Sequence, residues 1–172
     1  ANSEHGSPRE RGVQRAMEAI EWTYRWGWTT PTLLEILSGT TRSGLANRLI
    51  KNGLLSRIPA PSGGINSTPT FLLTLTQKGL ETAVEITDEL LPYQTDPHRI
   101  NFKNVSHDEL VQRLTAKYLC FTQESGGIDD YKTPKQLHTW NADSTKIPDA
   151  VWVKGKGKDA QEFAVEVELS PK

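Results

Sequence analysis

The carboxyl-terminal part of the chain alternates apolar and polar residues with a period of two, a pattern typical of β-strands. The alternation runs through 147–153 and again through 162–169, and the glycine- and lysine-rich segment 154–159 between them has the composition of a turn. We therefore expect a β-hairpin. Its second arm should place two sets of side chains on opposite faces, Phe163, Val165, Val167 and Leu169 on one and Glu162, Ala164, Glu166 and Glu168 on the other.

This hairpin is expected to bring acidic side chains together. With a turn centred near Gly157, Asp149 falls opposite Glu166, and Glu168 lies one pleat further along the same face. Like charges that face each other across strands destabilise a sheet by up to about 1 kcal/mol. A divalent cation reverses that effect, because Mg²⁺ is commonly held by one or two carboxylates. The alternative is that the acids line the solvated face of an ordinary amphipathic hairpin.

Composition narrows the class of protein. The single cysteine, Cys120, excludes an internal disulfide and a multi-cysteine zinc site, and its apolar neighbours predict a buried thiol. No apolar run approaches the roughly 20 residues of a membrane span, and the polar amino terminus does not have the pattern of a signal peptide. We expect a soluble cytoplasmic protein with no membrane segment.

The net charge of −1 hides an uneven distribution. No acidic residue lies between Glu35 and Glu81. The basic residues inside that interval are Arg42, Arg48, Lys51, Arg57 and Lys78. A surface that faces phosphates requires such a basic segment. The alternative is a chance run of solvated basic side chains.

The first half of the chain, after a polar leader at 1–8, has the signals of short helices followed by two strands. Apolar spacing, N-caps, prolines and glycines predict helices at about 8–24, 30–37, 41–52 and 76–91, with strands at 54–58 and 71–75 around a Gly/Pro/Ser-rich loop. This order resembles the winged-helix DNA-binding proteins over residues 10 to 91. The resemblance implies a DNA-binding set that consists of Arg42, Ser43, Asn47, Arg48, Lys51 and Arg57, with the loop tip 62–67 on the backbone or minor groove. Winged helices also serve as protein-binding modules, which is the alternative.

The second half follows a predicted linker at 92–98. Ser106 and Glu109 have the spacing of a capping box, which predicts a helix from Ser106 to about Phe121. We expect His107, in its first turn, to be a surface or capping residue, with catalysis as the alternative. The remaining expectations are a short strand at 100–102, a loop with solvated Asp129 and Asp130 at 125–132, a strand at 136–140 and a turn at 141–146.

A helix, Pro148-Asp149, a hairpin and Glu166-Val167-Glu168 resemble the core of the PD-(D/E)XK nucleases. Glu168 stands where lysine is usual, and Lys172 lies four residues beyond it. Together with the front half, these motifs resemble the replication-relaxation family, which includes MobC-type plasmid relaxases. That resemblance implies metal-dependent, strand-specific nicking of DNA at a plasmid transfer origin.

Several roles are implied by this resemblance. Asp149, Glu166 and Glu168 would bind Mg²⁺ or Mn²⁺, and Lys172 would add positive charge to the catalytic set. Partners would be DNA and relaxosome accessory and coupling proteins. The alternative is a replication initiator or transcriptional regulator that binds DNA without catalysis.

The expected fold is α+β, with a winged helix-turn-helix followed by an α/β restriction-endonuclease-like domain. The expected divisions are a disordered leader at 1–8, a DNA-binding domain at 9–91, a linker at 92–98 and a nuclease-like domain at 99–172. Because such nuclease cores continue with a helix and further strands after the acidic strand, we expect the last domain to be incomplete.

Overall fold

The computed structural model describes residues 6–41, 44–61, 69–93, 95–96, 100–121, 124–140 and 146–169. The chain is a mixed α+β protein whose described strands form two small antiparallel sheets. Its elements are α1 (Pro8–Trp26), α2 (Pro31–Ser38), α3 (Leu45–Lys51), β1 (Leu55–Pro59), β2 (Phe71–Leu75), α4 (Gln77–Thr87), η2 (Phe102–Asn104), α5 (Val105–Cys120), β3 (Asp130–Lys132), α6 (Pro134–Trp140), β4 (Ala150–Lys154), η3 (Gly157–Asp159) and β5 (Gln161–Val165). No helix in these ranges is both long and apolar enough to span a bilayer.

The first two helices form where local signals predict them. Ser7 and Glu10 form a reciprocal capping box at the start of α1, and Gly27 ends the helix in the left-handed conformation at φ 91°. At α2, the Thr30 side chain accepts a hydrogen bond from the Leu33 amide, and Pro31 occupies the first turn. The predicted helices at about 8–24 and 30–37 are confirmed.

Two helix boundaries differ from the prediction. The third helix begins at Leu45 instead of residue 41, after Gly44 adopts a left-handed conformation at φ 65°. Helix α4 ends at Thr87 instead of Leu91, because Asp88 takes a left-handed conformation at φ 50°. The chain beyond Asp88 then turns back onto α1, where the Leu91 amide donates to the hydroxyl of Tyr24 at 2.7 Å.

The first sheet pairs β1 with β2, with Leu55 opposite Leu75. A backbone bridge between Thr29 and Leu73 adds the segment before α2 to this sheet. Four successive residues of β2, Leu72 to Leu75, are buried, so this strand is enclosed on both faces. Both strands were predicted.

The second sheet has the order β3-β4-β5, in which both pairs are antiparallel. The β4–β5 hairpin confirms the predicted turn, but its second arm is a strand only from Gln161 to Val165. Strand β3 lies within the segment 125–132, which was predicted to be a loop. Asp129 and Asp130 are exposed as expected, yet the Asp129 amide donates to the Val153 carbonyl at 2.9 Å and extends the pairing with β4.

The predicted strand at 136–140 is wrong, because Pro134–Trp140 forms helix α6. The Thr133 amide donates to Oε1 of Gln136 at 2.9 Å, and the Gln136 amide donates to Oγ1 of Thr133 at 3.5 Å. This is a capping box, with Pro134 at the first helical position. The sequence Thr-Pro-Lys-Gln therefore starts a helix and prevents an extended segment.

The entry into α5 also differs from the prediction. The helix begins at Val105, preceded by the 3₁₀ turn η2 in place of the strand expected at 100–102. The expected capping box does not form: Asn104 occupies the N-cap position without a side-chain cap bond, and Glu109 pairs with Arg113 instead. Because η2 already supplies a helical lead-in, the first turn of α5 does not depend on a side-chain cap.

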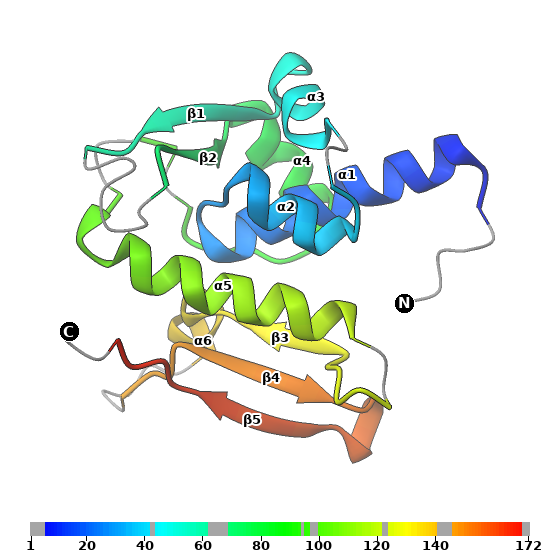
Figure 1. The fold of residues 1–172 in the computed structure, drawn as a ribbon, viewed down its shortest axis with the longest axis vertical. Helices are drawn as coiled ribbons and strands as arrows, with labels where there is room; N and C mark the ends of the chain where they lie inside the picture. The colour runs from blue at the N-terminus through cyan, green and yellow to red at the C-terminus, as the bar shows by residue number, and fades with distance from the viewer. Residues whose placement is uncertain are drawn as a thin grey trace.

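The halves of the chain share one core. Helix α5 lies between the front helices and the three-stranded sheet (Figure 1), and α2 packs against it. A single cluster of buried side chains includes Trp22 and Leu34 from the front and Ala116 and Tyr131 from the back. The predicted division into domains at 9–91, 92–98 and 99–172 stays a prediction, and the contacts described here cross it throughout.

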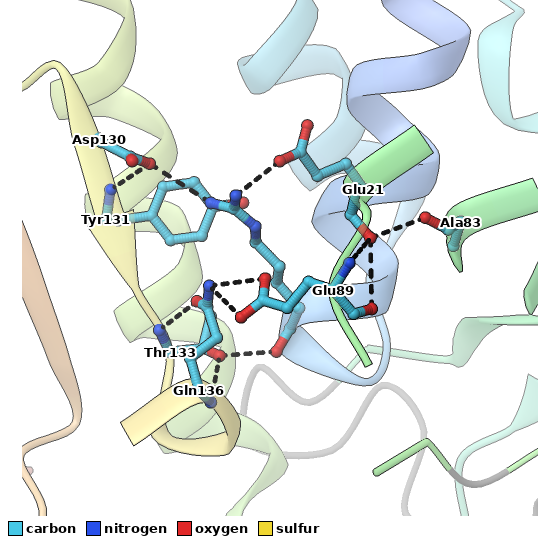
Figure 2. A network of polar contacts seen from close by, with 9 residues as sticks. Glu21, Ala83, Glu89, Asp130, Tyr131, Thr133 and Gln136 are labelled. Carbon is cyan, nitrogen blue, oxygen red and sulfur yellow. Dashed lines mark hydrogen bonds and ion pairs between the residues drawn. The ribbon is translucent and has the colours of Figure 1, made fainter. Parts of the chain in front are cut away.

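Polar contacts reinforce this junction (Figure 2). Arg25 pairs with Glu21 at 2.7 Å and with Asp130 at 3.3 Å, and its guanidinium lies over the ring of Tyr131. On the same side, Nε2 of Gln136 donates to the carboxylate of Glu89, so that β3 and α6 are joined to α1 and to the segment after α4.

The predicted linker begins with an anchored residue. The hydroxyl of Tyr93 accepts a hydrogen bond from the Leu75 amide at 2.8 Å and donates to the Gly27 carbonyl at 2.9 Å. Burial raises the pKa of Tyr93 well above its ordinary value. Tyr93 therefore fixes the start of the 92–98 segment against β2 and the end of α1.

Candidate functional site

Asp149 occupies a bend immediately before β4. Its amide donates to the Val165 carbonyl at 3.0 Å, and its Oδ2 accepts a hydrogen bond from the Val167 amide at 2.8 Å. The register of the hairpin pairs Ala150 with Val165, so Asp149 lies beside the end of β5, as its predicted position opposite Glu166 requires.

The direction of the Asp149 side chain was not predictable from alternation. Its Oδ2 lies 3.2 Å from Nε2 of His107 on α5, and the indole of Trp152 also donates to α5, at Thr115. Asp149 and Trp152 are three residues apart, and in a regular strand such residues point to opposite faces of the sheet. The bend at Asp149 breaks this rule and turns its carboxylate to the helix side of the sheet.

His107 connects helix α5 to the carboxyl-terminal segment. Its Nδ1 lies 3.0 Å from Oδ1 of Asp108, and its Nε2 lies 2.9 Å from the Val167 carbonyl as well as near Asp149. Every one of these neighbours is an acceptor, so a ring protonated at both nitrogens satisfies them all. His107 is therefore a partly exposed bridge between α5 and the segment after β5, and its catalytic role stays a prediction.

The charges at this site shift two pKa values. Burial lowers the pKa of His107, but the hydrogen bond to Asp108, the charge of Asp149 and the Val167 carbonyl outweigh it and raise the pKa above its ordinary value. Burial also raises the pKa of Asp108, and the hydrogen bond from His107 opposes that rise without cancelling it. The site favours a proton on the imidazole when no other cation is present.

The other predicted metal ligands, Glu166 and Glu168, are more exposed than Asp149. Glu166 is 46% exposed in its side chain and pairs with Lys146 at 3.2 Å, and Glu168 is exposed. Within the described ranges, no group of three or more His, Cys, Asp or Glu side chains is arranged to hold a metal ion. Lys172 lies outside the described residues. The ligand set Asp149, Glu166 and Glu168 stays a prediction, and of its members Asp149 contacts α5 through His107.

The expected apolar face of the second arm is largely open. Phe163 is 49% exposed and Leu169 is 54% exposed. Strand β5 is the outer strand of the described sheet, whereas Trp152 on the central strand packs against Tyr118 of α5. The cover that α5 provides thus reaches β4 and leaves Phe163 half uncovered.

A second candidate surface lies on α3 and β1. Asn47, Arg48 and Lys51 are exposed along α3, while Leu45 and Leu49 are buried beneath them. Arg57 of β1 donates from Nη2 to Oδ1 of Asn47 at 3.3 Å. Four of the six residues in the predicted DNA-binding set are therefore placed on or beside one exposed surface.

The rest of this set is not placed by the structure. Arg42, Ser43 and the loop tip 62–67 lie outside the described residues. Lys78, from the same basic interval of the sequence, donates to the carbonyl of Asn52 at 3.2 Å and thus lies at the end of α3.

Cys120 does not match its prediction as a buried core thiol. It is exposed at the last position of α5, where its thiol donates to the Ile36 carbonyl at 3.1 Å. Its neighbour Leu119 packs against the core instead.

Sequence reasoning missed two parts of the Asp149 site. Asp108 carried a visible signal, because an acid next to a histidine in a first helical turn suits a hydrogen-bonded pair. The Val167 backbone carried none, since any residue supplies an amide and a carbonyl. No protein-family model, curated protein or solved structure matches this chain.

Proposed function

We propose that this protein binds duplex DNA through the surface formed by α3 and β1. The contact between Arg57 and Asn47 carries the proposal, because it joins the strand to the outer side of the helix. Arginine and asparagine are side chains that contact phosphates and read base edges. The absence of acidic residues between Glu35 and Glu81 supports an anionic partner.

The packing under α3 also supports this role. Leu45 and Leu49 anchor the inner face of the helix at 3% and 2% exposure, so its outer side chains project from a fixed backbone. The order of three helices and two paired strands is the one that the resemblance to winged-helix proteins rests on. In such proteins the third helix enters the major groove.

The test is fluorescence anisotropy of a labelled DNA duplex, measured at several salt concentrations. We expect the affinity of the wild-type protein to fall steeply with salt. The double variant Arg48→Ala/Lys51→Ala should bind more weakly and reduce the magnitude of the salt slope by about 2, since each phosphate contact contributes about 1.

The matched control is Lys156→Ala/Lys158→Ala, which removes the same charge from the exposed β4–β5 turn. Figure 1 shows this turn at the opposite end of the molecule from α3. Equal loss of affinity in both double variants would indicate a nonspecific charge effect and contradict a binding surface on α3.

A second candidate function is metal-dependent nicking of DNA, as in the replication-relaxation proteins that the motifs resemble. The observation that favours it is the fixed Asp149 carboxylate, which is 24% exposed at the start of β4. A divalent metal, Mg²⁺ or Mn²⁺, would neutralise the phosphodiester and activate a water. Relaxosome accessory and coupling proteins would then be partners in plasmid mobilisation.

Relaxation of a supercoiled plasmid that carries a transfer origin, in the presence of Mg²⁺ or Mn²⁺, tests this second candidate. Asp149→Asn should abolish relaxed circles while duplex binding is kept. Binding without any metal-dependent relaxation would instead favour a replication initiator or regulator that grips DNA without cutting it.

A further inference from the structure

The Asp149 site contains a set of ligand atoms that the acidic motif does not predict. His107 Nε2 lies 3.2 Å from Asp149 Oδ2 and 2.9 Å from the Val167 carbonyl oxygen. In an octahedral metal site with bonds near 2.1 Å, neighbouring ligand atoms lie about 3 Å apart. Both separations from His107 Nε2 are hydrogen bonds through the proton on that nitrogen, and their lengths also match an edge of such a coordination polyhedron.

The orientation of the His107 ring supports the same interpretation. Asp108 Oδ1 lies 3.0 Å from Nδ1 and accepts a hydrogen bond from it, which directs Nε2 to the other two oxygens. Histidine ligands of metals characteristically donate their second ring nitrogen to a carboxylate in this way. A cation that replaced the proton on Nε2 would leave the hydrogen bond to Asp108 in place.

The predicted ligand Glu166 has a different neighbour. Its carboxylate pairs with the exposed Lys146 at 3.2 Å. His107 and Asp149 are both partly open, with side-chain exposures of 26% and 24%, so water has access to the remaining coordination positions.

We infer that His107 Nε2, Asp149 Oδ2 and the Val167 carbonyl form a binding site for a divalent transition-metal ion, with Asp108 as the positioning residue. This inference specifies the ligands of the metal ion in the nicking proposal. Only the catalytic role of that ion rests on the nicking proposal. An imidazole, a carboxylate and a carbonyl together suit Mn²⁺ better than Mg²⁺, because Mg²⁺ prefers oxygen ligands alone.

The test uses Mn²⁺ alone, without DNA, titrated into the full chain and followed by the electron paramagnetic resonance signal of free Mn²⁺. We expect saturable binding that is weakened at least about tenfold by His107→Gln and by Asp149→Asn, and about tenfold by Asp108→Asn through loss of ring orientation. The control is His138→Gln, which changes an exposed histidine on α6 in the same way and should leave the affinity unchanged.

A second readout does not depend on variants. In histidine side-chain ¹⁵N spectra of the wild-type protein, substoichiometric Mn²⁺ should broaden the His107 resonances before those of His138. Circular dichroism of each variant separates lost metal binding from lost folding.

Binding that is lost in Glu166→Gln or Glu168→Gln but kept in His107→Gln would overturn the inference and favour the acidic ligand set. Binding with equal affinity in the wild type and His107→Gln, or no saturable binding at all, would also overturn it. The nicking proposal fails separately. Mn²⁺ binding that depends on His107, without plasmid relaxation, would support the metal site and contradict the nicking activity. Plasmid relaxation that depends on Asp149, with Mn²⁺ binding that does not depend on His107, would support the activity and contradict this ligand set.

Discussion

The indole Nε1 of Trp22 donates a hydrogen bond of 2.9 Å to Oε1 of Gln112, ninety residues further along the chain. The same glutamine donates from Nε2 to the Trp28 carbonyl at 3.1 Å. Gln112 is fully buried, and both of its polar ends are satisfied by the front half of the chain. One side chain of α5 thus fixes the position of α1 and of the turn that follows it.

Replacing Gln112 should destabilise the whole molecule. Gln112→Ala leaves the Trp22 N–H and the Trp28 carbonyl without partners and opens a cavity, so we expect the free energy of unfolding to fall by about 3 kcal/mol. Urea denaturation followed by both tryptophan fluorescence and circular dichroism measures it. The control Gln14→Ala removes an exposed residue of α1 that bonds Glu18, and should change stability by less than about 0.5 kcal/mol. Equal effects in the two variants would contradict the role of Gln112.

Two glycine-to-alanine substitutions should have opposite effects. A Cβ at Gly79 would overlap the carbonyl oxygen of Leu54, and because that atom is backbone, α4 and the residue that precedes β1 must separate. We expect Gly79→Ala to cost about 3 kcal/mol. Gly12 lies inside α1 with its nearest neighbour 3.9 Å from the new Cβ, so Gly12→Ala should stabilise the protein by about 0.5–1 kcal/mol. Thermal unfolding compares them, and a stable Gly79→Ala variant would show that α4 packs less closely on Leu54.

Replacing Thr133 at the start of α6 should cost about 2 kcal/mol. Thr133→Ala removes the cap to Gln136, which is typically worth about 1 kcal/mol, and also the hydrogen bond of 2.8 Å from Oγ1 to the Arg25 carbonyl. The control Thr139→Ala removes a hydroxyl that bonds only within the same helix, at Lys135, and should change stability by less than about 0.5 kcal/mol. Urea denaturation distinguishes the two; similar losses would indicate that the Thr133 cap contributes little.

His107 makes stability depend on pH. Its pKa is raised in the folded protein, so its stabilising effect is complete below the unfolded value of about 6.5 and is lost as the pH rises through the folded pKa. With a chelator present, the gap in unfolding free energy between the wild type and His107→Gln should therefore be larger near pH 6 than near pH 9. A gap of constant size would contradict the charged bridge.

Local signals in the sequence were sufficient for much of the fold. Pro31 after Thr30 started α2, and the alternation around the Gly157 turn produced the β4–β5 hairpin. The elements that differ from the prediction depend on caps and backbone conformations, which hydrophobic periodicity does not specify. Thr133 and Gln136 have the spacing of a capping box, which outweighs the strand predicted at 136–140, while the early end of α4 follows from the left-handed conformation of Asp88.

The candidate sites also combine features that the sequence predicts with features that depend on tertiary packing. Alternation placed Asp149 beside the end of β5, and the gap in acidic residues located the α3 surface. The pairing of His107 with Asp149 joins residues 42 positions apart, and it depends on how α5 lies on the sheet. Hairpin periodicity carries no information about that packing.

Helix α5 has 16 residues and is thus about 24 Å long. It packs on α2, and its Thr115 and Tyr118 contact Trp152 of the sheet, so the α3 surface and the Asp149 end are joined through packed elements. If both sites contact one nucleic acid, the distance between the phosphate bound at α3 and the phosphate at Asp149 is fixed by this packing. Changing the length of a linker would not alter that distance.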